Sequence, residues 1–99
     1  MEILKDKNGG TLTISLSGRL DTLSAPRFEE ELKASISGIT ELVLDLANLE
    51  YMSSAGLRIL LSAQKTMNTQ GKMIVKNVND TIMEIFEVTG FNEILTIEK

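Results

Sequence analysis

The chain has 99 residues, of which 42% are hydrophobic and 24% are charged, and its 14 acidic and 10 basic residues leave a net charge of −4. This length and hydrophobic content suit one domain over residues 1–99 with one modest core. Cysteine and histidine are absent, which excludes disulfides, thiolate nucleophiles, Cys/His metal sites and Ser–His catalysis, so we expect a protein that is not an enzyme.

The chain opens with the pattern of a β-hairpin. Ile3–Lys7 is a short strand candidate, and Thr11–Ser17 alternates apolar and hydroxyl side chains as a half-buried strand does. Between them, Asn8-Gly9-Gly10 is a turn signal, because Asn-Gly readily takes the positive φ values of a type I′ turn.

A helix is predicted next, over Ala25–Ser37. The preceding residues, Gly18–Ser24, have the composition of a loop, and Ser24 can cap the helix. Pro26 is tolerated in a first turn, where its missing N–H costs nothing. Gly38 is well placed to end the helix.

The central stretch changes from a strand to a second helix. Leu42–Leu46 is a short run that is apolar except for Asp45, which suits a buried strand ending there. Apolar residues then recur on one side of a helix that Gly71 ends. The opposite, outward side carries Arg58, Ser62 and Lys65.

Ser53 and Ser54 lie between this strand and this helix, and two interpretations of them stay open. A serine at this position caps helices in many proteins. Alternatively, its hydroxyl is presented beside the unpaired amides and the positive dipole end of the first helical turn, which favour oxyanions. Spacing alone does not decide between a capping serine and a reactive one.

The remaining residues predict a strand over Met73–Val75, a helix capped by Asn79 or Asp80 and stopped by Gly90, and a last strand over Ile94–Ile97. The element order is ββαβαβαβ. Strands joined through helices should lie parallel, whereas the opening hairpin is antiparallel. We therefore expect an α/β fold with a mixed, mainly parallel β-sheet flanked by three main helices.

Partners are limited by charge and hydropathy. Nucleic-acid binding needs a basic patch, and none is visible. The sequence has no run of about 18 apolar residues and no apolar segment at its beginning. We expect a cytoplasmic monomer that binds neither nucleic acid nor membrane.

Two segments carry a resemblance to a known family. Leu-Val-Leu-Asp-Leu, residues 42–46, followed by Tyr-Met-Ser-Ser-Ala-Gly-Leu-Arg, residues 51–58, resembles the central signature of the STAS domain of bacterial anti-sigma factor antagonists. The resemblance covers nearly all of the chain and implies a single STAS-like domain. In that family a partner kinase phosphorylates the serine directly before the small-Gly-Leu segment, which implies Ser54 here. Some members have Asp where this chain has Ser53, so Ser53 is a competing acceptor.

Asp21 ends a second similar segment, Gly18-Arg19-Leu20-Asp21, which in the family lies near the acceptor loop. The residue has two interpretations, a turn residue and a contact at the partner surface, and both stay open. If the helix after Ser54 lies along the partner, its outward residues should matter for binding.

The resemblance implies an anti-sigma factor antagonist. Unphosphorylated, it would bind an anti-sigma factor that is also a serine kinase and so release the sigma factor. Phosphorylation on Ser54 would end binding until a serine phosphatase restored the protein. ATP and magnesium would belong to the kinase, so the chain itself is expected to need no cofactor.

Two other functions are alternatives to this one. One is a STAS scaffold subunit of a sensory or transport assembly that is never phosphorylated. The other is a small enzyme that uses Asp21 and Ser54, which the absence of histidine and cysteine disfavours.

Overall fold

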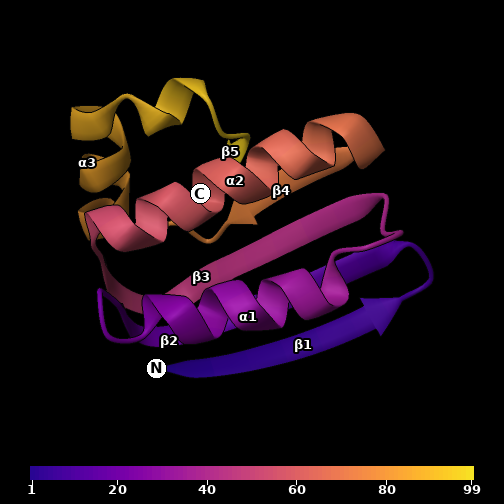
Figure 1. Cartoon of the computed structure of the whole chain (residues 1–99). Coiled ribbons are helices and arrows are strands. Elements are labelled where there is room, and N and C mark those ends of the chain that lie inside the picture. Colours follow the sequence, from indigo (N-terminus) through magenta and orange to yellow (C-terminus); the bar gives the residue numbers. More distant parts are fainter.

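Five strands form one sheet in the order β1-β2-β3-β4-β5, so that every strand pairs with its neighbours in sequence. The structure is a computed structural model that describes residues 1–99. Its elements are β1 (Glu2–Asn8), β2 (Thr11–Leu20), α1 (Ala25–Ser35), β3 (Glu41–Met52), α2 (Ser54–Gln70), β4 (Lys72–Lys76), α3 (Asp80–Thr89), the short 3-10 helix η1 (Phe91–Glu93) and β5 (Ile97–Glu98) (Figure 1).

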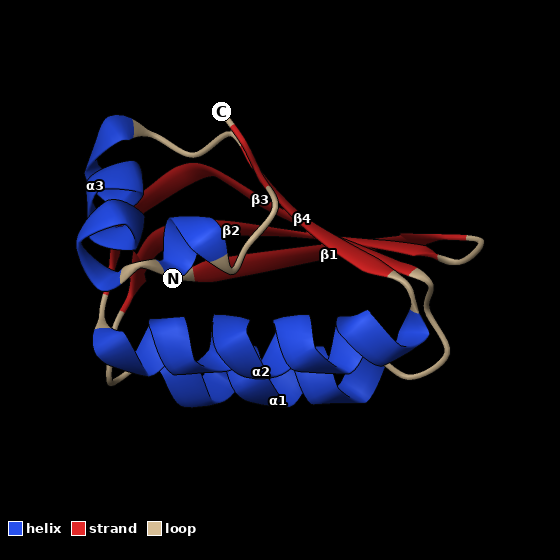
Figure 2. Ribbon diagram, turned by 90° about the horizontal axis from the view of Figure 1, so that it is seen from above, coloured by secondary structure: helices blue, strands red, loops and turns tan.

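Strand directions follow from the connections. The hairpin makes β1 and β2 antiparallel, and every later pair of strands is parallel because a helical connection returns the chain to the starting edge. Helices α1 and α2 lie side by side over one face of the sheet, whereas α3 lies at one end, against β3 (Figures 1 and 2). The predicted α/β fold with a mixed, mainly parallel sheet and three main helices is confirmed, and β3 is in the sheet's interior.

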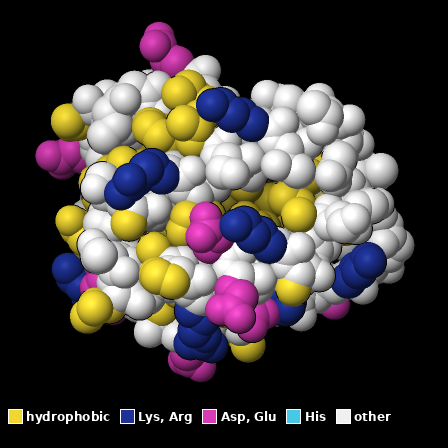
Figure 3. All heavy atoms as spheres, in the orientation of Figure 1, with side chains coloured by type: hydrophobic (Ala, Val, Ile, Leu, Met, Phe, Trp, Pro, Cys, Tyr) yellow, Lys and Arg dark blue, Asp and Glu magenta, His cyan; other side chains and the backbone are white.

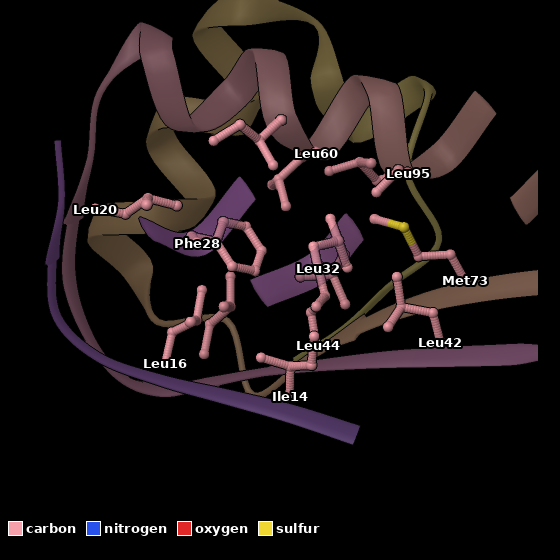
Figure 4. Packing of buried hydrophobic residues seen from close by; sticks show 14 of the residues in the cluster. Ile14, Leu16, Leu20, Phe28, Leu32, Leu42, Leu44, Leu60, Met73 and Leu95 are labelled. Atoms are coloured by element: carbon pink, nitrogen blue, oxygen red, sulfur yellow. The ribbon is translucent and has the colours of Figure 1, made fainter. Parts of the chain in front are cut away.

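The core lies between the sheet and the pair α1 and α2. Alternate residues of β2 and β3 point to this side, including Ile14 and Leu44, which are fully buried. They meet Phe28 and Leu32 of α1 and Leu60 of α2 (Figure 4). The intervening residues of both strands are only partly buried and mostly polar, so one sheet face carries the core.

The two strands that lead to the site are longer than their apolar patterns predict. We expected β2 to end at Ser17 and β3 at Leu46, but they continue to Leu20 and Met52, which pair with each other. Register shifts interrupt this extension, which explains why the alternation of apolar residues is lost. Backbone pairing, together with the burial of Leu20 and Met52 at the strand ends, therefore carries both strands on to their last residues.

Three boundaries are corrections of the sequence prediction. The hairpin turn centres on Gly9-Gly10, and only Gly9 has positive φ, a pattern of type II′ rather than the predicted type I′. Helix α1 ends at Ser35 instead of Ser37. The predicted last strand, Ile94–Ile97, is wrong in its first part, because the chain forms η1 and a further turn in which the Leu95 amide donates to Phe91 O before Ile97 pairs with Val75.

Candidate functional site

Ser53 and Ser54 occupy the junction between β3 and α2, and their backbone is fixed there. The Ser53 amide donates to the Leu20 carbonyl at the end of β2, at 2.8 Å. The Ser53 carbonyl accepts from the Leu57 amide at 3.0 Å, the first hydrogen bond of α2. Ser53 is thus the N-cap residue and Ser54 the first helical residue.

The two hydroxyls differ in access. The Ser53 Oγ is buried without a hydrogen-bond partner and makes no capping bond to the helix. The Ser54 side chain is exposed and also makes no hydrogen bond within the chain. Ser53 thus occupies the N-cap position without the side-chain hydrogen bond that the capping interpretation implies, and Ser54 offers the hydroxyl that a partner can reach.

Gly56 explains how the start of α2 comes so close to the strand ends. A Cβ atom on Gly56 would lie 2.7 Å from Leu20 Cγ and 2.9 Å from Met52 Cγ, closer than carbon atoms pack. The first turn of α2 therefore rests directly on the ends of β2 and β3. Close packing therefore explains this glycine, and it fixes the helix start that carries Ser54 against the sheet.

The first turn of α2 has free hydrogen-bond donors. The amides of Ser54, Ala55 and Gly56 have no acceptor within the chain, and the turn contains no acidic residue. Unpaired amides and the positive end of the helix dipole stabilise negative charge. A negatively charged group attached to Ser54 is thus compatible with an intact helix.

Asp21 directly follows β2, and Ser53 directly follows β3. The last residues of these strands, Leu20 and Met52, are paired, so Asp21 and Ser53 lie at neighbouring strand ends. The Asp21 Oδ1 accepts from the amides of Leu23 and Ser24, at 3.1 Å each. The hydrogen bond from the Ser24 amide, aided by the Ser24 hydroxyl and the nearby Arg19 guanidinium, lowers the pKa of Asp21. The carboxylate thus shapes the turn before α1, as the turn interpretation predicted.

The outward side of α2 carries Arg58, Ser62 and Lys65, all exposed. Arg58 lines an open hollow between α1 and α2, together with Ala55 from its own helix and Glu29 from α1. Ser62 lines a second hollow further along the same two helices. Lys65 lines neither of these two hollows, so the three residues predicted together divide into two groove residues and one outer residue.

Several exposed side chains near this end of the sheet escaped the sequence analysis. Leu23 is 91% exposed in the loop before α1, and Val88 of α3 is 81% exposed. Tyr51 lies in an apolar hollow with Val88, and the Arg19 guanidinium stacks 4.5 Å from its ring. A leucine in an otherwise polar loop was the signal for Leu23, whereas only the folded chain brings Tyr51 to Val88.

Charge on the helical face is dispersed. Basic side chains on the face of α1 and α2 are scattered among acidic and apolar ones and form no continuous patch (Figure 3). None of the helices is both long enough and apolar enough to cross a membrane.

Comparisons with known proteins show the family to which this fold belongs. The model of the STAS domain matches residues 2–99. The chain belongs to the STAS domain family. BtrV of Bordetella bronchiseptica, named as a candidate anti-sigma factor antagonist, is 36% identical over 99 residues, 98% of this chain and 85% of BtrV. The anti-sigma-B factor antagonist of Listeria monocytogenes is 27% identical over 97 residues, 96% of this chain and 85% of that protein. These names are those of regulators, not enzymes.

Solved structures share the STAS fold. A crystal structure of an anti-sigma factor antagonist from Mycobacterium paratuberculosis superposes with a TM-score of 0.89 at 23% identity, covering 98% of this chain and 84% of that one. The phosphorylated form of the Bacillus cell fate determinant SpoIIAA gives a TM-score of 0.77 at 19% identity, covering 99% and 92%. At these identities the likeness concerns the fold.

Proposed function

We propose that this STAS domain is an anti-sigma factor antagonist whose binding is switched off by phosphorylation of Ser54. Unphosphorylated, it binds an anti-sigma factor that is also a serine kinase, and the sigma factor is released. The kinase supplies ATP and magnesium, and a serine phosphatase reverses the modification. The observation that carries the proposal is the exposed, unpartnered Ser54 hydroxyl, fixed at the start of α2.

The geometry favours Ser54 over Ser53 as the acceptor. A kinase must bring the γ-phosphoryl group in line with the attacking oxygen, so that oxygen must be reachable. The buried Ser53 Oγ could meet this requirement only if the β3–α2 junction opened. Such opening would break the hydrogen bond between Ser53 and Leu20 and separate Gly56 from the strand ends.

The partner surface in this proposal surrounds Ser54. Arg58 and Ser62 supply contacts from the groove formed by the two hollows between α1 and α2. Asp21 acts indirectly, because its carboxylate holds the loop that presents exposed Leu23. Lys65, outside the groove, forms the rim, where charges contribute more to association rate than to affinity.

Phosphorylation acts at the interface in this proposal, not on the fold. A phosphoserine carries about −1.5 to −2 charges, which the free amides and the dipole of α2 tolerate. The partner, however, must accommodate a bulky dianion where it accepted a neutral hydroxyl. Steric exclusion and the cost of removing water from the phosphate then weaken binding.

Mass spectrometry tests the acceptor. Protein purified from its native cells should lose the mass of one phosphoryl group on phosphatase treatment, and peptide mapping should place that group on Ser54. Ser54→Ala should abolish the modification. Ser53→Ala and Ser24→Ala, which remove neighbouring serines, should keep it.

Modification of Ser53 in the Ser54→Ala variant would contradict the assignment of the acceptor. Recovery of the protein with sensory or transport components, without any kinase and without phosphate, would favour the scaffold alternative instead.

A further inference from the structure

Arg58 is a cation without an anionic partner, one helical turn after Ser54. No carboxylate lies within 4.0 Å of its guanidinium, whereas Lys5, Arg19 and Lys72 each have one. Arg58 is exposed and lines the open hollow between α1 and α2. Its charge is therefore available to a new anion.

Helix geometry directs Arg58 toward Ser54. Residues four apart lie on the same helix face, with about 5–6 Å between their Cβ atoms. Each Cα–Cβ bond tilts toward the helix N-terminus, so a long side chain covers the turn before its own Cα. For Arg58 that turn contains Ser54 and Ala55, and Ala55 does line the same hollow.

The acidic groups near the hollow do not form an ion pair with Arg58. Glu29 of α1 lines the hollow but is not within ion-pair distance of Arg58. In the loop before α1, Asp21 is occupied by the amides of Leu23 and Ser24. A phosphate dianion with three acceptor oxygens attracts a guanidinium more strongly than a single, more distant carboxylate does.

We infer that a phosphoryl group on Ser54 captures the Arg58 guanidinium in an i,i+4 ion pair on the surface of α2. The inference rests on the proposed function for the presence of the phosphate. Phosphorylation then changes the partner surface twice: it adds a dianion at Ser54, and it withdraws the cation that the groove offers in the unphosphorylated form. Arg58 is a positioning residue in this switch.

The ion pair can be tested without any partner protein. Phosphoserine is installed at position 54 during synthesis of the full chain, and ³¹P NMR follows the second ionisation of the phosphate between about pH 4.5 and pH 8, around its ordinary value near 6. A guanidinium beside the phosphate favours the dianion, so the titration midpoint should lie lower in wild type than in Arg58→Gln. We expect a difference of about 0.15–0.4 pH unit, the size that a helix-surface ion pair gives.

Two further variants show whether the effect is local and due to charge. Lys65→Gln removes one positive charge from the same face, but about 16 Å along the helix axis, beyond the Debye length of about 10 Å, so its midpoint should equal that of wild type. Arg58→Lys keeps the charge and should restore most of the difference. Raising the salt concentration to about 1 M should shrink the difference, because the pair is exposed.

Equal midpoints for wild type and Arg58→Gln would overturn the inference. So would an equal shift in Lys65→Gln, or failure of Arg58→Lys to restore the midpoint. None of these outcomes touches the proposed function, which fails separately if no kinase phosphorylates Ser54 in the native cells.

Discussion

Helices α1 and α2 each begin just after the carboxyl end of a strand, and a serine stands before each of them. At the start of α1 the polar groups are used within the chain. The Ser24 hydroxyl accepts from the Asp21 amide and donates to the Arg19 carbonyl, at 3.0 and 2.7 Å. The amides of Ala25 and Arg27 both have acceptors, and Pro26 between them has no N–H.

At the start of α2 the corresponding groups are free. Neither Ser53 nor Ser54 makes a side-chain hydrogen bond, and three successive amides from Ser54 to Gly56 have no acceptor. The two helices thus begin differently, although a serine and an alanine stand at both starts. We call the start of α1 closed, because its polar groups are hydrogen-bonded within the chain, and the start of α2 open, because its polar groups are not. An open start costs stability unless something else compensates, and it is where a covalent anion can be added without disturbing the fold.

The largest expected effect concerns partner binding at the open start. Phosphorylation of Ser54 should weaken binding to the cognate anti-sigma factor several hundredfold, a penalty of about 3–4 kcal/mol. Isothermal titration of both forms measures it, with Ser54→Ala as a form that binds constitutively. Equal affinity of both forms would show that the open start is not a switch.

Gly56→Ala should come next in size, because it pushes the α2 start away from the strand ends. The added Cβ would meet Leu20 Cγ at 2.7 Å and Met52 Cγ at 2.9 Å, so the overpacking cost should lie at the upper end of its usual range, about 2–3 kcal/mol. Better helix propensity offsets about 1 kcal/mol of this cost. Denaturant unfolding should show a net loss of about 1–2 kcal/mol, against less than about 0.5 kcal/mol for the exposed Ser62→Ala. An equally stable Gly56→Ala would mean that close contact is not what fixes the start of α2.

Removing each serine hydroxyl in turn compares the two starts directly. Ser24→Ala leaves a carbonyl and an amide without their partner and should cost about 1–2 kcal/mol in the free energy of unfolding. Ser53→Ala removes a buried hydroxyl that has no partner, so stability should stay the same or rise slightly. The opposite ranking in a denaturant titration would contradict the contrast between a closed and an open start.

Phosphoserine should have opposite effects on stability at the two positions. At position 54 the dianion meets free amides, so the melting temperature should stay the same or rise by a stabilisation of about 0.3–1 kcal/mol. At position 24 it would displace a bonded hydroxyl beside a first helical turn whose amides already have acceptors, and the melting temperature should fall. Calorimetry of the two modified chains decides; a large drop for position 54 would mean that the switch works by unfolding.

The smallest expected effect is a pH dependence of stability that arises from Asp21, at the closed start of α1. The pKa of Asp21 is lowered in the folded chain, first of all by the Ser24 amide, so its stabilisation is present above the unfolded value of about 3.9 and is lost as the pH falls through the lower folded value. Asp21→Asn should therefore melt below wild type near neutral pH, with a difference that narrows toward about pH 3. A difference that does not change with pH would show that the carboxylate charge is not what matters.

Much of the fold could be predicted because periodicity and turn chemistry agree over most of the chain. The alternation in Thr11–Ser17 and the helix stop at Gly90 are both observed, and Gly90 takes the left-handed conformation that ends many helices. The prediction of a strand over Ile94–Ile97 was wrong, because the apolar side chain of Leu95 does not belong to a strand. It fills the core from a turn, and only two residues of the edge strand pair with β4.

The site was predictable in position but not in detail. The Ser53-Ser54 pair and its glycine could be found from the chain, and the resemblance favoured Ser54. Which of the two hydroxyls is exposed depends on the continuation of β3 to Met52, which no apolar alternation indicates. The polar partners of Asp21 and the stacking of Arg19 on Tyr51 likewise arise only when neighbouring strand ends meet.

The continuation of β3 up to the residue before Ser53 has a further consequence for recognition. Kinases that modify flexible tails can act on short peptides, since the tail has no shape before it binds. Here the hydroxyl has a defined orientation only while a sheet strand on one side and a helix on the other hold it. A peptide spanning residues 48–62 would contain the acceptor serine but not β2 and the rest of the sheet, which hold it in place. We expect such a peptide to be a poor substrate. The kinase would therefore modify only a folded domain. A damaged or unfolded copy would not be phosphorylated and would take no part in signalling.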